Sequence, residues 1–581
     1  MMPLEPASLQ SHVFKHPAGK HTGSNIDDRL PRCLSVLLGA AIALILATEW
    51  IAMPLRYFVN DDYQMIYTTW LRSLGQIPGT DFSIQSFHLL PEMLRPILSL
   101  SGEDPDRLWM FRMPFFLCLA TLPLLVWYIT GRIVGRSAAP FAALASLLNW
   151  GMLERGLDIR PDLVLAVLVL LQLAIAVRAN FRSRDALIIG ILSAFMLALR
   201  LKSVLFLPVI LGWLIVRGDD DLDHAPHRRA KMTRSGLFAA GALIGALITV
   251  GTIYLLGLLP AFIDGNRSLA HLARQHMTDS SIRTETMSLL WTRDTIWLGL
   301  FSLGLFAWRK LWLRRGINWY LTSLLVTGLV YIALNPAFYA YSLVILLPLM
   351  SPFIGLACAE LLRLGKRVKL QTAVMLALLT AWFGSHVPLL ANLATRPTNE
   401  DQLQLARAFR TTEPTTQIFS LEGIGLFRPS IRDWRLSSVA LEHYRQGEID
   451  LLGQLQSSRP EIIVKSYRIP DWLRPQDRRW LAQHYIHVSP QLAVLGAALN
   501  ADESAQFVIS RDSSFEVIEG ALRIDDTWHV QGDTVALPAG VHSLRSGSIK
   551  STLRFAWPAG IALGPSGHPY LIPPQFSLYD P

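Results

Sequence analysis

The chain has 581 residues, of which 51% are apolar and only 17% are charged. A soluble globular protein carries about 25% charged residues. Runs of about 20 apolar residues, each long enough to cross a hydrocarbon core of about 30 Å, recur between positions 34 and 392 and then stop. The composition therefore excludes a soluble enzyme, a disordered chain and a single-span receptor, and it predicts a polytopic α-helical membrane protein.

The formal net charge of +9 has an explanation that needs no nucleic acid. Cytoplasmic loops of membrane proteins collect Lys and Arg, so we expect membrane lipids and no nucleic acid as partners. Cys33, Cys118 and Cys358 are widely spaced, and they offer neither a metal-ligand spacing nor a disulfide framework. The first 30 residues are polar and lack the apolar stretch of a signal peptide, which predicts that the first span is an uncleaved anchor.

Hydrophobicity predicts about eleven spans. They are placed at 34–54, 108–130, 137–152, 162–178, 184–200, 203–217, 235–260, 290–308, 318–335, 339–362 and 370–392. Every loop assigned to the side of the N-terminus is basic, whereas the loops assigned to the other side carry fewer Lys and Arg. This asymmetry predicts a cytoplasmic tail at 1–33, a transmembrane domain at 34–392, and an extracytoplasmic region after it.

Two long segments are predicted on the outer side. In the first periplasmic loop, 55–107, Tyr63, Ile66, Tyr67 and Trp70 follow the spacing of an amphipathic helix, and a second stripe runs from Phe87 to Leu98. Such helices lie in the membrane interface. The second segment, 261–289, is polar. Its His271 and His276 are five residues apart, which does not place them on one helix face, so we assign no metal to them.

The composition changes after Pro388. Residues 400–500 combine helical stripes with two short strands at 417–421 and 461–465, which predicts an α/β domain. Residues 505–581 are rich in strands and turns, which predicts a small antiparallel sandwich. Trp528 and Trp557 in this part either pack within the sheets or stack on sugars.

Two acidic clusters are predicted to lie at the outer rim of the membrane, where a carboxylate is costly. Asp61 and Asp62 follow the first span directly, and Asp158 and Asp162 flank Arg160 at the start of the fourth. Helix capping is the alternative explanation of the first pair, and interaction with the helix dipole is the alternative for Asp162.

Basic and aromatic residues occupy two further outer turns. Arg200 and Lys202 lie where basic residues are disfavoured, so they either hold a lipid phosphate or reach ordinary headgroups. Tyr339 and Tyr341 either belong to the interfacial aromatic belt or line a lipid groove. Carboxylates that deprotonate a hydroxyl, together with cations that stabilise a departing phosphate, suit the transfer of a sugar from a phospholipid carrier. The chain has no Gly-rich phosphate loop.

The order of these features resembles the GT-C superfamily of membrane glycosyltransferases, which includes protein O-mannosyltransferases and the aminoarabinose transferases of lipid A. The similar residues are the acidic pair Asp61-Asp62, the progression from Leu74-Gly75 through Pro78 to Asp81-Phe82, Arg160-Pro161-Asp162, Lys202, and Tyr339, Tyr341 and Pro348. The resemblance covers about 50–390. Many members have an Arg or His beside the late aromatic residues, and 335–341 has neither, so phosphate binding would depend on Lys202 or Arg160.

The resemblance implies an inverting transfer from a polyprenyl-phosphate-linked sugar to a glycan, lipid or protein acceptor in the cell envelope, at the periplasmic face of a bacterial inner membrane. It implies Asp61 as the base, with Asp62 as second choice, and Asp162 as a residue that orients the acceptor or supports the base. Asp158 is the weaker candidate for this supporting role. No organic cofactor is implied, no metal ligand is assigned, and the use of a divalent metal is left open. The alternatives are a membrane scaffold or transporter in polysaccharide assembly, and a glycan polymerase or ligase of another fold.

Overall fold

The computed structural model describes residues 32–83, 89–178, 181–216, 227–274, 280–312, 316–334, 339–363, 368–395, 399–436, 438–466 and 468–557. Several predicted features lie outside these residues. They are most of the N-terminal tail, Phe87, His276, the turn at 335–338 and the last part of the β-rich region, from 558 on.

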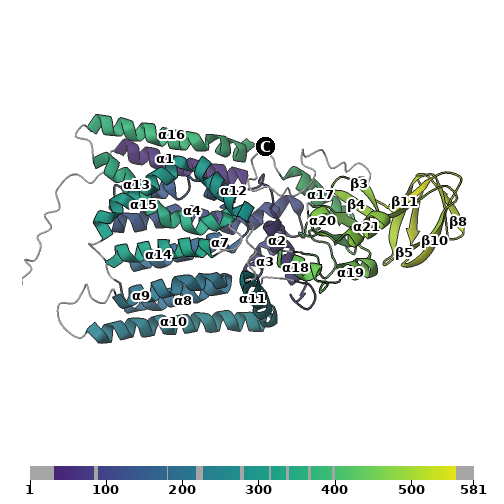
Figure 1. Cartoon of the computed structure of the whole chain (residues 1–581), viewed down its shortest axis with the longest axis horizontal. Helices are drawn as coiled ribbons and strands as arrows, with labels where there is room; N and C mark the ends of the chain where they lie inside the picture. The colour runs from purple at the N-terminus through teal and green to yellow at the C-terminus, as the bar shows by residue number, and fades with distance from the viewer. Residues whose placement is uncertain are drawn as a thin grey trace, which may run out of the picture.

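A bundle of roughly parallel helices forms one end of the molecule (Figure 1). Its helices are α1 (Arg32–Ala52), α4 (Met113–Ile133), α5 (Ala139–Ala145), α6 (Trp150–Arg155), α7 (Pro161–Ala176), α8 (Ser183–Leu199), α9 (Leu207–Val216), α10 (His227–Leu255), α13 (Thr295–Trp312), α14 (Gly316–Ala333), α15 (Leu343–Arg363) and α16 (Val368–Thr395). By length and composition, five described segments can cross a membrane: Cys33–Ala52, Pro105–Ile133, Met232–Leu255, Ala340–Arg363 and Ala373–Asn392. Shorter apolar helices accompany them, and the count of eleven spans stays a prediction.

The structure differs from the prediction at 137–152, where α5 and α6 are separated by residues 146–149. Asn149 is in an extended conformation, and its side chain accepts the backbone N–H of Met152 at 2.8 Å. Both carboxylate oxygens of Asp294 accept the N–H of Trp150, at 3.0 and 3.1 Å. These side chains satisfy two of the backbone N–H groups at the start of α6.

The segment 261–289 was predicted to be a polar loop, but most of its described part is helical. It contains α11 (Leu259–Arg274) and the beginning of α12 (Ser280–Arg293). Asp294 separates α12 from α13, so the predicted span at 290–308 is also interrupted. The buried His386 of α16 contacts Asp294 at 3.0 Å, which ties this interruption to the neighbouring helix.

Close packing of two helices depends on glycine. Gly190 of α8 and Gly241 of α10 lie where an added Cβ would overlap the backbone carbonyl oxygens of Phe238 and Leu187. Only a residue without a side chain allows the two backbones to approach this closely, as is common between membrane helices.

The first loop forms α2 (Asn60–Ser73), α3 (Leu90–Ser101) and the 3₁₀ helix η1 (Pro105–Arg112). These elements lie between the bundle and the C-terminal region, which continues along the long axis of the molecule (Figure 1). Both predicted helices are confirmed in the described part of the loop. However, α2 is buried over Asp62–Arg72 because the C-terminal region covers the side that an interfacial helix would leave open.

The C-terminal region contains a sheet of seven strands and a sheet of four. The larger sheet has the order β1-β2-β4-β11-β6-β9, with β3 paired to β4, and the smaller sheet has the order β5-β10-β7-β8. The strands are β1 (Ile418–Phe419), β2 (Ile462–Val464), β3 (Tyr485–Ser489), β4 (Leu492–Leu499), β5 (Ser504–Ile509), β6 (Ser513–Glu519), β7 (Ala521–Ile524), β8 (Thr527–Val530), β9 (Thr534–Leu537), β10 (Gly540–Ser546) and β11 (Ser551–Phe555). The remaining helices are α17 (Glu400–Thr411), α18 (Ser438–Arg445), α19 (Leu451–Ser458), α20 (Arg468–Trp472) and α21 (Pro475–His484). Because β4 pairs with β11, the larger sheet runs through both of the regions predicted at 400–500 and 505–581.

Hydrogen bonds fix the C-terminal region against the first loop. The Gln402 side chain accepts the N–H of Phe58 at 2.8 Å and donates to its carbonyl at 2.9 Å. The Tyr67 hydroxyl donates to the carbonyl of Arg428 at 2.9 Å, and its ring packs edge-on against Trp434 with centroids 4.8 Å apart. These contacts hold the loop of the C-terminal region that contains Trp434 close to the start of α2.

Candidate functional site

The two adjacent acids at the start of α2 have different environments. Val59 is the N-cap residue, and Asp62, in the third helical position, accepts the Val59 N–H at 3.4 Å. Asp62 is fully buried, whereas the side chain of Asp61 is 32% exposed. Helix capping therefore explains Asp62 and does not explain Asp61.

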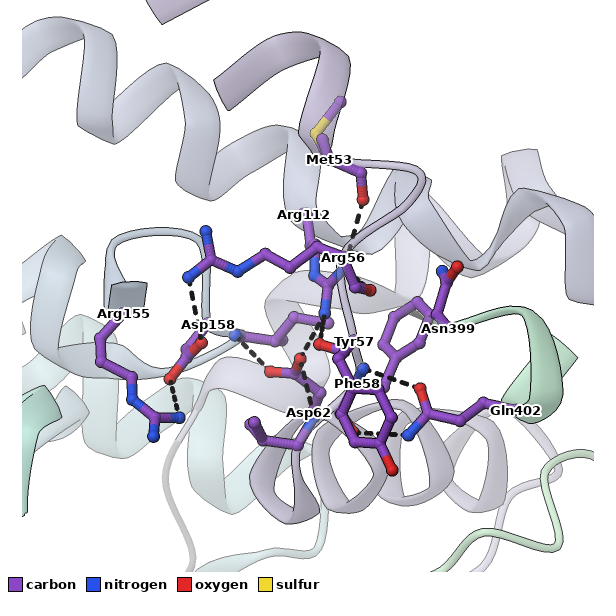
Figure 2. A network of polar contacts seen from close by, with 12 residues as sticks. Met53, Arg56, Tyr57, Phe58, Asp62, Arg112, Arg155, Asp158, Asn399 and Gln402 are labelled. Carbon is purple, nitrogen blue, oxygen red and sulfur yellow. Dashed lines mark hydrogen bonds and ion pairs between the residues drawn. The ribbon is translucent and has the colours of Figure 1, made fainter. Parts of the chain in front are cut away.

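Asp62 belongs to a buried network of polar groups (Figure 2). One of its oxygens pairs with Arg112 at 2.8 Å, and the other accepts the N–H of Ile159 at 2.7 Å. Arg112 also donates to the carbonyls of Arg56 and Tyr57, at 2.6 and 2.7 Å. Asp62 thus joins the end of the first span to the loop that precedes α7, and it has no exposed surface at which a substrate can approach.

Asp158 lies in the same network, 3% exposed, between Arg155 at 3.6 Å and Arg56 at 4.0 Å (Figure 2). Burial raises the pKa of Asp158 to about 7, and the charge of Asp62 adds to this effect, whereas the arginines oppose it. The geometry makes Asp158 a buried partner of two arginines and places it away from solvent.

Asp61 contacts two guanidinium groups. One oxygen forms a close ion pair with Arg160, the N-cap residue of α7, and the other lies 3.6 Å from Arg435 of the C-terminal region. Among the four predicted acids, Asp61 alone has substantial exposure. A carboxylate at which solvent and cations meet is suited to exchange a proton with an arriving hydroxyl.

Asp162 fixes the positions of two arginines. It is 2% exposed, accepts from Arg160 Nε at 3.3 Å, and forms a close ion pair with Arg200. Lys202 lies close enough to Arg200 and Asp162 for the charges of both residues to act on its ammonium group. The structure thus brings Arg160 together with Arg200 and Lys202, which were predicted from a second stretch of sequence.

The two tyrosines form one wall of this cluster. Tyr341, in the 3₁₀ helix η4 (Ala340–Ser342), lies under the guanidinium group of Arg160, whose Cζ is 3.2 Å from the ring centroid. Tyr339 stacks on Tyr341 with ring centroids 5.3 Å apart. Contact with a charged side chain favours a role in the site over membership of an interfacial belt.

Sequence reasoning missed three residues here. Arg112 and Arg435 carried no signal, because a lone arginine in a polar or apolar stretch has no distinctive spacing. Tyr331 of α14 is the third, and it lies close enough to Arg160, Arg200 and Asp162 for their charges to act on its hydroxyl group. This buried hydroxyl has no hydrogen-bond partner among the described residues. A tyrosine near the outer end of a predicted span was a weak signal that could have identified it.

A cavity of about 940 Å³ lies at the other end of α2. It is lined largely by apolar side chains of α3, α8 and α10, together with Trp70 and Ser73 of α2. Asp61 and Trp70 are nine helical residues apart, which corresponds to about 14 Å along the axis. The cavity and the charged cluster therefore lie near opposite ends of α2.

Within the described ranges, no group of three or more His, Cys, Asp or Glu side chains is arranged to hold a metal ion. His271 lies on α11, but its side chain and His276 are outside the part that the structure describes. Trp557 is buried near Phe409, and Trp528 is 53% exposed. Only Trp528 keeps a surface on which a sugar can stack.

The family model described as dolichyl-phosphate-mannose-protein mannosyltransferase matches residues 93–254, a part that includes Arg160, Asp162, Arg200 and Lys202. A comparison with curated protein sequences gives no match.

Two solved structures of ArnT have a fold similar to that of this chain. ArnT from Cupriavidus metallidurans bound to undecaprenyl phosphate matches with a TM-score of 0.56 and 13% identity, over 80% of this chain and 98% of that chain. The apo state of that ArnT gives 0.54 and 12% over the same shares. The Archaeoglobus fulgidus oligosaccharyltransferase, in complex with Zn and sulfate, gives 0.46 and 9% over 87% of this chain and 94% of that one.

The chain resembles GT-C superfamily membrane glycosyltransferases. The resemblance predicted from the sequence is thereby confirmed. The fold of this chain is a helical membrane-type fold like that of ArnT, with several apolar helices and a C-terminal β region.

Proposed function

We propose that this protein is an inverting glycosyltransferase that moves a sugar from a polyprenyl-phosphate-linked donor to a glycan, lipid or protein acceptor of the cell envelope. The observation that carries the proposal is the position of Asp61. It is the exposed member of the predicted acids, and it lies against a cluster of guanidinium groups built from separate segments. The ArnT of similar fold was solved with undecaprenyl phosphate bound, which supports the class of donor.

In the proposed reaction, Asp61 acts as general base. It accepts the proton of the acceptor hydroxyl while the hydroxyl oxygen attacks the anomeric carbon of the sugar. The bond between that carbon and the phosphate oxygen breaks, and the electron pair leaves with the phosphate. Attack opposite the leaving group inverts the configuration at the anomeric carbon. A general base of this kind contributes about 10²–10⁴-fold to the rate.

Arg160, Arg200 and Lys202 are proposed to bind the donor phosphate and to stabilise the charge that develops as it leaves. Guanidinium groups match phosphate oxygens through paired hydrogen bonds. Asp162 holds Arg160 and Arg200 in place, so we propose it as a positioning residue rather than one that contacts the acceptor. Asp62 and Asp158 are proposed to support the site through the buried network, and Tyr339 and Tyr341 to form its wall.

The apolar cavity beside α3 is proposed to hold a long hydrocarbon chain of a lipid-linked substrate. Its lining by α3, α8 and α10 suits a lipid tail, and Arg95 and Glu103 among its lining residues provide a polar edge. The outer orientation of this end of the bundle, and the inner membrane as location, belong to the same proposal. The basic loops at the opposite end support them.

The test is the loss of a glycan when the gene is deleted. We expect mass spectrometry to show one envelope glycan, glycolipid or glycoprotein missing a sugar, and the wild-type gene to restore it. Asp61→Asn should fail to restore it, whereas Asp526→Asn should succeed because Asp526 is 97% exposed in the β-rich region. Full restoration by Asp61→Asn would contradict the role of Asp61 and favour a scaffold or transporter, and unchanged envelope glycans after deletion would contradict the proposed function.

A further inference from the structure

Arg435 reaches the charged cluster from the C-terminal region. Its guanidinium group is 12% exposed and lies 3.6 Å from Asp61. The adjacent Trp434 is buried against Tyr67 of α2, and the N–H of Ser83 donates to the carbonyl of Arg432 at 3.0 Å. On the other side of Arg435, the carbonyl of Leu436 accepts a hydrogen bond from the Arg468 guanidinium group at 3.0 Å, so the loop is held on both sides of Arg435.

The cluster around Asp61 has more positive than negative groups. Its described cations are Arg160, Arg200, Lys202, Arg435 and Arg468, and its described acids are Asp61, Asp162 and Glu422. Burial raises the pKa of Glu422, which weakens one of the three negative charges further. Burial, followed by the charges of Arg468 and Arg160, lowers the pKa of Arg435 to about 9. Arg435 is therefore a half-buried cation whose charge is incompletely compensated by the described acids, as expected where an anion such as phosphate binds.

Both oxygens of Asp61 are engaged by guanidinium groups, one by Arg160 and one by Arg435. A carboxylate held in this way is not available to an arriving hydroxyl, because both of its oxygens are occupied by ion pairs. An arriving phosphate competes for the same two arginines. When the phosphate takes them, Asp61 is released for the acceptor hydroxyl.

We propose that Arg435 is a ligand of the donor phosphate supplied by the C-terminal region, and that it rests on Asp61 until the donor binds. The inference rests on the proposed function and adds a role for the C-terminal region in binding the donor. Arg435 and Arg160 leave Asp61 for the phosphate, so that donor binding and activation of the base are coupled. No covalent change is involved in this exchange.

The test measures binding of undecaprenyl phosphate to the full-length chain in nanodiscs, with undecaprenol as the uncharged probe. Arg435→Gln should weaken binding of undecaprenyl phosphate about tenfold, the equivalent of one lost charge-assisted hydrogen bond, and leave undecaprenol unchanged. Arg435→Lys keeps the charge and should show a smaller loss. The matched control is Arg432→Gln, since Arg432 is exposed in the same loop and donates to the carbonyl of Gly79 at 3.0 Å.

The outcomes separate the two proposals. If the wild-type chain binds undecaprenyl phosphate no better than undecaprenol, the proposed donor class and the role of Arg435 both fail. If the wild type prefers the phosphate and Arg435→Gln binds it as well as Arg432→Gln does, only the role of Arg435 fails. Thermal unfolding of each variant identifies a folding defect. If Arg435→Gln does not fold, Arg435→Lys decides: weaker phosphate binding supports the role, and wild-type binding overturns it.

Discussion

The adjacent residues Asp61 and Asp62 are proposed to have different roles, one in catalysis and one in stability, and substitution of each tests this division. Asp62→Asn removes the ion pair with Arg112 at 2.8 Å, while Arg112 keeps its bonds to the carbonyls of Arg56 and Tyr57. Breaking a buried ion pair costs about 3–5 kcal/mol. Because the amide oxygen of Asn can still accept the N–H of Ile159, we expect the free energy of unfolding to fall by about 3 kcal/mol, near the lower end of that range.

Asp61→Asn should have the opposite profile. Its ion pairs are partly exposed, and exposed pairs contribute about 0–1 kcal/mol, so the free energy of unfolding should change by no more than this. Transfer should fall by about 10²–10⁴-fold through loss of the base. The assays are unfolding followed by tryptophan fluorescence in nanodiscs, and sugar transfer under the same conditions.

The double variant Asp62→Leu with Arg112→Met serves as a control. It leaves the N–H of Ile159 and the carbonyls of Arg56 and Tyr57 without these side-chain partners, each at a cost of about 1–3 kcal/mol, so it should be less stable than Asp62→Asn. Wild-type stability of Asp62→Asn, or a loss of stability in Asp61→Asn as large as that in Asp62→Asn, would refute the division of roles.

Three further predictions follow from the structure. The pKa of Asp158 is about 7, above its ordinary value near 3.9, so the native chain binds this proton more tightly than the unfolded chain. The contribution of Asp158 to the free energy of unfolding is therefore fully present below about pH 4 and is lost as the pH rises to about 7. Asp158→Asn should flatten this decline in unfolding measurements at pH 5 and 8, and an unchanged slope would contradict it. Gly241→Leu should destabilise the packing of α8 on α10 by about 1–3 kcal/mol in the same unfolding assay, whereas Gly251→Leu should not, because nothing lies within 4 Å of a Cβ at Gly251. Thr252→Trp fills the apolar cavity and should raise the KM for the lipid-linked substrate without lowering kcat, whereas Val250→Trp on the exposed face of α10 should leave both unchanged.

The sequence predicted the helices and the charged segments better than it predicted the connections between them. A run such as that of α15 is apolar throughout, and hydrophobicity alone identifies it. The interruption at 146–149 was missed because Asp294, which accepts the N–H of Trp150, is distant in sequence. Strands β3 and β4 were missed within a stretch expected to be largely helical, because their pairing with distant strands decides their structure.

For the site, position relative to the membrane predicted which acids and cations would meet, but not what each would do. Asp61 and Asp62 are adjacent residues of the same type, so the sequence does not distinguish their roles. Only the fold shows that Asp62 is buried against Arg112 and that Asp61 is partly exposed beside Arg160. Arg435 was beyond prediction, because its approach to Asp61 depends on how the C-terminal region packs on α2.

A structure of the full-length chain with undecaprenyl phosphate bound would test the assigned phosphate site directly. We expect the phosphate about 2.7–2.9 Å from guanidinium nitrogens of Arg160 and Arg200, with Asp61 released from Arg160. A phosphate bound elsewhere, with Arg160 still paired to Asp61, would contradict it.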